Sequence, residues 1–263
     1  MKIFWSFARQ AFHFIAAYRF NFFMEFFLVL LRMYGIYWVW RVLYTQRPDA
    51  FGVDLDQMVT YGVMGMAIEL FIWSRPQWYM ANQVKSGAID TDLMKPMDFH
   101  FYMLARSVGE VLTSIAVLAL PAILTAYLIL DVQLPPDLLN GLIFVASLVL
   151  GFLLLFHLNF ILGSLSVVAL DIRHISWAYF SLVRFLGGQI VPLWLFPPFI
   201  RVLAEVLPFQ GTYYLPISIY IGRLSGADAI RAVEFQFVWL VALVVLSRLL
   251  WTWAYRRLVV QGG

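Results

Sequence analysis

The chain has 263 residues and contains no cysteine, which excludes disulfides, thiolate metal sites and a cysteine nucleophile. Histidine is also scarce, and no two histidines have the paired spacing of a zinc-binding helix. The four are His13, His100, His157 and His174. We therefore expect no metal site and no thiol redox chemistry within this chain.

Charged residues make up only 13% of the chain, whereas 63% of its residues are hydrophobic and the mean hydropathy is +0.83. A water-soluble fold could not bury so large an apolar share. The composition therefore predicts an all-α integral membrane protein. A P-loop is missing as well, because no glycine-rich loop ends in Lys followed by Ser or Thr. Any ATP-driven activity would require a separate ATP-binding subunit.

A helix that crosses the hydrocarbon core needs about 20 mostly apolar residues. On that scale the chain divides into six predicted spans. They cover residues 22–44, 57–74, 107–130, 141–169, 175–196 and 235–254. Only the polar run at residues 171–174 separates the fourth span from the fifth, so this is the weakest boundary.

Basic residues in short loops stay on the cytoplasmic side of a membrane. With both termini cytoplasmic, ten basic residues lie inside and four lie outside. The inner set is Lys2, Arg9, Arg19, Arg75, Lys85, Lys95, Arg106, Arg173, Arg256 and Arg257, and the outer set is Arg47, Arg201, Arg223 and Arg231. We therefore predict a multi-pass protein with cytoplasmic termini, whose net charge of +3 reflects topology rather than nucleic-acid binding.

Residues 1–20 do not resemble a cleavable signal peptide, because charged residues interrupt them and no small-residue cleavage site follows. Lys2, Ser6, Arg9 and His13 recur at helical spacing, so they would line one face of a helix. The segment is predicted to lie as an amphipathic helix in the membrane interface. It would either anchor the first span or contact a partner.

The longest polar interruption lies in residues 75–106, where KSGAIDTDLMKPMD occupies residues 85–98. Pro76 can begin a helix that Gly87 ends. Asp90 and Asp92 suit the start of a second short helix, which Pro96 ends. This pattern indicates either a compact helical docking surface in the cytosol or an ordinary solvated connection between spans.

Ionisable residues within spans are costly and need a partner or water. Glu25 and Arg32 lie two turns apart on one face of the first span, and Glu69 should lie at an intermediate depth on the second. We expect these three to cluster, as an ion pair that locks the bundle rather than as a contact with cargo. Arg184 is the fourth deep charge, and His157 indicates a hydrogen bond between helices rather than a proton relay.

Residues 197–234 are too apolar for a free loop and too short and broken to span. We expect this segment to re-enter the outer leaflet and pack against the bundle, because non-helical backbone at membrane depth needs protein or water partners. Glycines and prolines supply the necessary kinks. They include Gly187, Gly188, Pro192, Pro208 and Pro216.

The sequence resembles the membrane subunits of bacterial ABC-2-type exporters. One similarity is the loop from Ser86 to Pro96 (SGAIDTDLMKP), followed by Tyr102–Arg106. Further similarities, in the same order as in that family, are GGQIVPLWLFPPF at Gly187–Phe199, LPF at Leu207–Phe209, YYLPISIYIG at Tyr213–Gly222 and the closing Arg256, Arg257, Gly262 and Gly263. Together these motifs cover most of the chain.

The resemblance implies a six-helix permease in the bacterial inner membrane that pairs with a second permease, identical or homologous, and with two ATP-binding subunits. These subunits would bind ATP and Mg²⁺, and the chain itself would need no cofactor. The loop would be the coupling helix, with Ser86, Asp90, Asp92, Leu93 and Lys95 contacting the ATPase and Gly87 and Pro96 shaping it. The segment with Gly187, Gly188, Pro192, Pro208 and Pro216 would be the external gate.

Two other classes of function stay open. A secondary transporter driven by an ion gradient would need no ATPase, but such proteins usually show internal repeats with broken helices in both halves. No convincing repeat is visible here. An intramembrane enzyme would need a paired catalytic motif, and none is present in the sequence. The residues do not identify the cargo, although the few polar groups favour an apolar or amphiphilic one.

Overall fold

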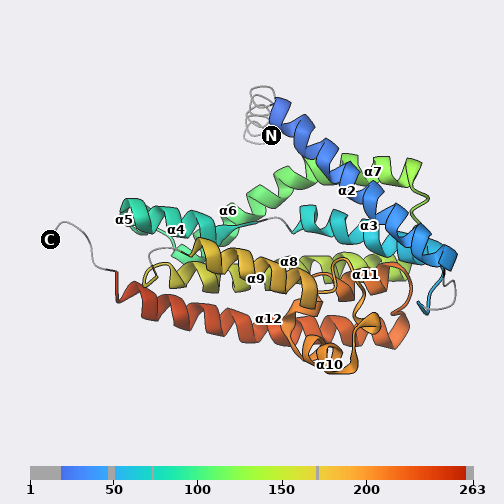
Figure 1. Ribbon diagram of the computed structural model, residues 1–263. Coiled ribbons are helices and arrows are strands. Elements are labelled where there is room, and N and C mark those ends of the chain that lie inside the picture. The colour runs from blue at the N-terminus through green and yellow to red at the C-terminus, as the bar shows by residue number, and fades with distance from the viewer. Residues whose placement is uncertain (1–18, 47–50, 73, 170–171, 259–263) are drawn as a thin grey trace.

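The computed structural model describes residues 19–46, 51–72, 74–169 and 172–258 (Figure 1). The amphipathic helix predicted for residues 1–20 and the closing glycines therefore lie outside the described residues, apart from the first turn of α2. All regular elements in the described part are helical. They are α2 (Arg19–Gln46), α3 (Leu55–Phe71), α4 (Pro76–Ser86), α5 (Ile89–Leu93), α6 (Phe99–Ser114), the π-helical turn η1 (Ile115–Ala119), α7 (Leu120–Ile129), α8 (Leu138–Leu165), α9 (Arg173–Leu186), η2 (Leu193–Leu195), α10 (Pro198–Val206), η3 (Pro208–Gly211), α11 (Tyr214–Tyr220) and α12 (Gly226–Tyr255).

Within the described ranges, five helical segments are long and apolar enough to cross a membrane. They are Phe23–Gln46, Leu55–Ser86, Phe99–Ile129, Leu138–Leu165 and Gly226–Tyr255. The second combines two separate helices, since α3 ends at Phe71 and α4 begins at Pro76. The third begins earlier than predicted because Asp98 caps α6 by accepting a hydrogen bond from the Phe101 amide at 3.0 Å. The last begins at Gly226 rather than 235, so the broken segment before it is shorter than predicted.

The fifth predicted span, residues 175–196, is not one continuous helix. α9 has 14 residues, which gives a length of about 21 Å, whereas the hydrocarbon core is about 30 Å thick. Gly188 ends this helical stretch with a φ of +71°, a conformation that glycine adopts readily. The remaining residues of the predicted span form turns and the short helix η2.

Neighbouring helices α8 and α12 run in the same direction. Asn140 contacts Leu224 just before α12, Ser147 contacts Gln236, and His157 contacts Ser247, so residue numbers rise together along both helices. The C-terminal end of α8 therefore lies far from the start of α12. The chain between them, which contains α9, must traverse the bundle from one end to the other, as Figure 1 shows.

The segment predicted to be external, residues 197–234, packs into the bundle in its second half. All seven residues of α11 are buried, and the helix lies against α8 and α3. Asn140 on α8 donates to the carbonyl of Ile219 at 3.1 Å, which fixes the end of α11. By contrast, α10 exposes an apolar stripe of Phe199, Val202, Leu203 and Val206.

Close packing between α3 and the turn after α9 requires a glycine at position 65. A Cβ atom added there would lie 2.0 Å from the carbonyl oxygen of Gln189, and this backbone atom has little freedom to move. We predict that Gly65→Ala destabilises the protein by about 1–3 kcal/mol, because it overpacks this contact. Thermal unfolding in detergent, followed by tryptophan fluorescence, measures the loss.

Gly109→Ala on α6 is the matched control, because no atom lies within 4 Å of the added Cβ. This variant should unfold at the wild-type temperature or slightly above it, since alanine is the better helix former. Equal unfolding temperatures for both variants would contradict the packing described here.

Candidate functional site

The polar stretch of residues 76–98, called the knob below, folds into two short helices at one end of the bundle (Figure 1). Pro76 begins α4, and Gly87 ends it in the left-handed conformation with a φ of +72°. Asp90 and Asp92 lie in the first turn of α5. The bounds of α4 agree with those predicted from the sequence, whereas α5 ends at Leu93, three residues before Pro96.

Asp92 is the centre of the hydrogen bonds within the knob. Its buried carboxylate accepts hydrogen bonds from the Tyr79 hydroxyl at 2.7 Å, the Gln83 amide at 2.8 Å and the Lys95 ammonium at 2.7 Å. Lys95 also lies 3.8 Å from the centre of the Tyr102 ring. Asp92 and Lys95, expected on the docking surface, are therefore engaged within the chain, where they hold α5 against α4.

The hydrogen bonds of Asp92 with Tyr79, Gln83 and Lys95, called the clasp below, favour the charged forms of Asp92 and Lys95. Burial alone would raise the pKa of Asp92, but the hydrogen bonds from Lys95, Gln83 and Tyr79 outweigh burial and lower it below 3.8. The hydrogen bond to Asp92 raises the pKa of Lys95 above its ordinary value. Both groups are ionised at neutral pH, so the ion pair is intact there.

The outward face of the knob is apolar at its tip. The side chains of Met94 and Met97 are 77% and 48% exposed, and Pro96 between them is also exposed. Ser86 is exposed but donates a hydrogen bond to the Asn82 carbonyl at 2.8 Å. Met97 was not singled out from the sequence, although a pair of methionines flanking a proline in a polar loop could have indicated an adaptable contact surface.

An aromatic cluster connects the knob to the long helices. Phe99 stacks on Trp251 of α12 with ring centres 4.4 Å apart, and both rings contact Phe160 of α8. Leu93 of α5 and Met80 of α4 pack against the same cluster. A displacement of the knob would therefore move α8 and α12.

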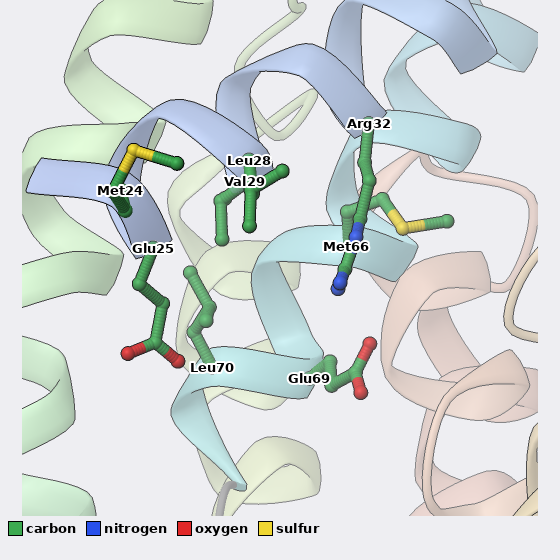
Figure 2. A pocket seen from close by; sticks show the side chains of 8 residues that line it. All are labelled: Met24, Glu25, Leu28, Val29, Arg32, Met66, Glu69 and Leu70. Carbon is green, nitrogen blue, oxygen red and sulfur yellow. The ribbon is translucent and has the colours of Figure 1, made fainter. Parts of the chain in front are cut away.

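A second polar site lies within the membrane-spanning part (Figure 2). Glu25 and Arg32 of α2 and Glu69 of α3 line one cavity of about 330 Å³. Figure 2 shows the three side chains directed into the same space, with apolar residues completing the wall. These are Met24, Leu28, Val29, Met66 and Leu70.

Glu69 is paired, but with Arg184 rather than with Arg32. The Arg184 guanidinium donates to one carboxylate oxygen of Glu69, and the Gln189 amide donates to the other at 2.8 Å. Gln189 is buried and also donates to the Gly65 carbonyl at 3.2 Å. Sequence reasoning missed Gln189, although a lone amide directly after two glycines in an apolar stretch could have indicated a partner for a buried charge.

Arg32 and Glu25 remain unpaired within the described part of the chain, where neither forms a hydrogen bond or ion pair. The three residues predicted to cluster do line one cavity, but the ion pair that Glu69 forms joins α3 to α9 and not to α2. Along α2, two turns or about 10.5 Å separate Arg32 from Glu25, which keeps these two side chains apart. Both carboxylate oxygens of Glu69 are already taken by Arg184 and Gln189.

His157 lies in a different cluster from these charges. Its ring is 3.0 Å from the Ser247 hydroxyl, which is also 3.2 Å from His100, and all three side chains are buried. The site joins α6, α8 and α12. His157 therefore bonds between helices, away from Glu25, Arg32 and Glu69, because it faces α12 rather than α2.

The predicted gate residues lie where the chain changes direction after α9. The carbonyls of Gly187 and Gly188 accept hydrogen bonds from the Tyr214 amide at 2.9 Å and the Tyr61 hydroxyl at 2.5 Å. Pro192 precedes η2, Pro208 begins η3 and Pro216 lies in α11. The two non-helical carbonyl groups thus find hydrogen-bond donors on the neighbouring helices α11 and α3.

Residues 30–262 match the family model described as ABC-2 family transporter protein. The chain belongs to this family. A search of curated proteins and a search of solved structures each found no match. Membership makes the chain a multi-pass membrane subunit of a transporter, a class that generally lacks a catalytic site of its own and works with ATP-binding subunits.

We predict that Asp92→Asn loosens the knob, because it removes the ion pair with Lys95 and weakens the hydrogen bonds from Tyr79 and Gln83. Losing such bonds at a buried carboxylate costs about 1–3 kcal/mol. Limited trypsin digestion after Lys85 should proceed faster in the variant, whereas Lys95 precedes Pro96 and is no trypsin site. Asp90→Asn, in the same short helix but with a half-buried side chain, should be digested like the wild type.

Acid should abolish the difference in stability between the wild type and Asp92→Asn. Because the folded-state pKa of Asp92 is lowered, its contribution to stability is fully present above pH 3.8 and is lost as pH falls through the folded-state pKa. The unfolding temperatures of the wild type and Asp92→Asn should therefore differ at neutral pH and converge in strong acid; thermal unfolding is the readout here because trypsin is inactive in acid. A constant difference throughout this titration would show that the clasp is not electrostatic.

Proposed function

We propose that this chain is the permease subunit of an ATP-driven ABC-2-type exporter, which forms the substrate path as a dimer. Two separate ATP-binding subunits would bind ATP and Mg²⁺ and dock on the knob. The observation that carries this proposal is the construction of the knob: a rigid clasp at Asp92 presents exposed methionines at its tip. An ordinary loop between spans would need neither feature.

The mechanism follows from the connection behind the knob. When the ATP-binding subunits close, they would push on the tip at Met94 and Met97. The clasp makes the knob move as a unit, and the aromatic cluster of Phe99, Phe160 and Trp251 transmits the displacement to α8 and α12. α8 packs against α11, and both α8 and α12 pack against η3, so the motion would reach the predicted gate.

We further propose six membrane passes, with both termini in the cytoplasm of a bacterial cell and the knob on the same side. The parallel arrangement of α8 and α12 supports this topology. It requires one crossing between them in addition to the five long helical segments, and α9 together with residues 187–196 would provide it. The absence of cysteine permits a clean test, since any introduced cysteine is the only thiol in the chain.

We predict that Thr91→Cys and Ser225→Cys react with a membrane-impermeant maleimide from opposite sides of the membrane. Both side chains are exposed, and three crossings would separate them. In intact cells Ser225→Cys should be labelled, whereas Thr91→Cys should be labelled only after permeabilisation. Labelling of both from the same side would mean that α9 does not cross and that the topology is wrong.

We predict that a pull-down of the tagged chain from its native membrane in mild detergent recovers a P-loop ATPase together with ATP hydrolysis. The double variant Met94→Ser, Met97→Ser should lose most of this partner, because it removes the apolar tip without touching the clasp. Phe199→Ser is the control: this residue is 76% exposed and belongs to α10, which lies away from the knob in Figure 1.

Recovery of the ATPase by the control but not by the double variant would support both the exporter function and the docking site. Recovery of the chain alone from all three preparations would favour the alternative, a secondary transporter driven by an ion gradient. Equal ATPase recovery by all three would keep the exporter and place the docking surface elsewhere.

A further inference from the structure

The charges around the intramembrane cavity do not sum to zero. The cavity of Figure 2 and an adjoining one share Glu69, and together they are lined by two carboxylates and three guanidiniums. These groups are Glu25, Glu69, Arg32, Arg75 and Arg184. Arg184 is paired with Glu69, and Arg75 is attracted to both Glu25 and Glu69. The five groups sum to one excess positive charge, and within the described residues Arg32 is the guanidinium among them that has neither an ion pair nor a hydrogen bond.

The position of Arg32 makes this excess charge significant. Arg32 lies in the middle of α2, about 20 Å from either end of the helix, so its guanidinium cannot easily reach water at a membrane surface. A charge at this depth normally faces a partner or a water-filled cavity. The cavity provides the space, and within the described part of the chain no carboxylate pairs with it.

The hollow extends toward the end of the bundle that carries the knob. A neighbouring cavity of about 560 Å³ shares Glu25 and Leu70 with the first and is lined on α6 by polar side chains. They are Arg106, Glu110, Thr113 and Ser114. Arg106 and Glu110 pair with each other at 3.1 Å, so they add polarity without net charge. A polar groove thus leads from the knob end of α6 to Arg32.

The wall of this groove is apolar on its other side. Met24 and Leu28 of α2 are half-exposed, and Met66 and Leu70 of α3 complete the surface. A molecule that is polar throughout would make no apolar contact with this wall, and one that is apolar throughout would leave the charge of Arg32 without a partner. A polar head joined to an apolar tail fits both sides.

We propose that the groove binds an amphiphile whose head carries one net negative charge on an oxyanion, held by Arg32. The substrate class deepens the exporter function proposed above and rests on it. A guanidinium suits a carboxylate or phosphate because its two parallel N–H groups match two oxygens. The head would enter along the polar groove, while the tail stays against the apolar wall and the surrounding lipid.

Binding to the chain alone tests the inference. The chain is placed in nanodiscs of phosphatidylcholine, and the binding of labelled phosphatidylglycerol is compared with that of labelled phosphatidylcholine, with empty nanodiscs as background. We expect selective binding of the anionic lipid. Arg32→Gln should weaken that binding about tenfold or more, as expected for the loss of a charge-assisted hydrogen bond. Arg32→Lys should lie between the two.

Arg41→Gln is the matched control. Arg41 lies on the same helix but outside the groove, 4.8 Å from the centre of the Tyr37 ring, and its variant should bind the anionic lipid like the wild type. Because Arg32 makes no bond within the described chain, Arg32→Gln should unfold at or above the wild-type temperature. This measurement separates lost binding from lost folding.

Three results would overturn the inference: equal binding of the two lipids, wild-type binding by Arg32→Gln, or displacement of the lipid by an equal concentration of inorganic phosphate. The last would show a site for a free anion. Failure here is distinct from failure of the exporter function, because the binding assay needs neither ATP nor a partner. An ATPase without lipid selectivity refutes only the substrate class, and selectivity without an ATPase refutes only the exporter.

Discussion

The parallel packing of α8 and α12 is the constraint on which the rest of this structure depends. Buried hydrogen bonds, among them that between Ser147 and Gln236 at 2.8 Å, hold the two helices in one register. Two adjacent helices that run in the same direction require a connection as long as the bundle. The chain between them therefore returns through α9 and the broken segment behind it. This connection brings Gln189 and Arg184 against α3, where they meet Glu69.

Charge burial follows from that connection. Glu69 is buried in the core of the bundle, and a carboxylate at such a position needs both opposite charge and hydrogen bonds. α9 supplies the guanidinium and the turn after it supplies the amide, so the charge on α3 depends on a segment more than 100 residues further along the chain. Among the described residues, Arg32 receives no such partner. The same arrangement that neutralises one acid leaves a cation facing an open groove.

The proposed mechanism uses two sites: the knob would bind the ATP-binding subunits, and the cavity would bind the cargo. At the knob, polar groups are satisfied internally, and the exposed tip at Met94 is apolar, which suits a surface that binds another protein. In the cavity, an unpaired charge is retained at a depth where it is costly, which suits a site for a charged ligand. The aromatic cluster around Phe99 lies between the knob and the long helices and provides a rigid connection.

The sequence by itself determined the membrane class, the helical boundaries around Pro76 and Gly87, and the family, because these depend on composition, local backbone preference and motif order. It also placed Glu25 and Arg32 on one face, since helical periodicity is a local property. Only the tertiary structure decided which charges pair: Arg184 reaches Glu69 because α9 returns along α3, and no local pattern encodes that contact. It likewise turned Asp92 inward, because burial depends on Tyr79 and Gln83 across a turn whose geometry the residue types alone do not specify.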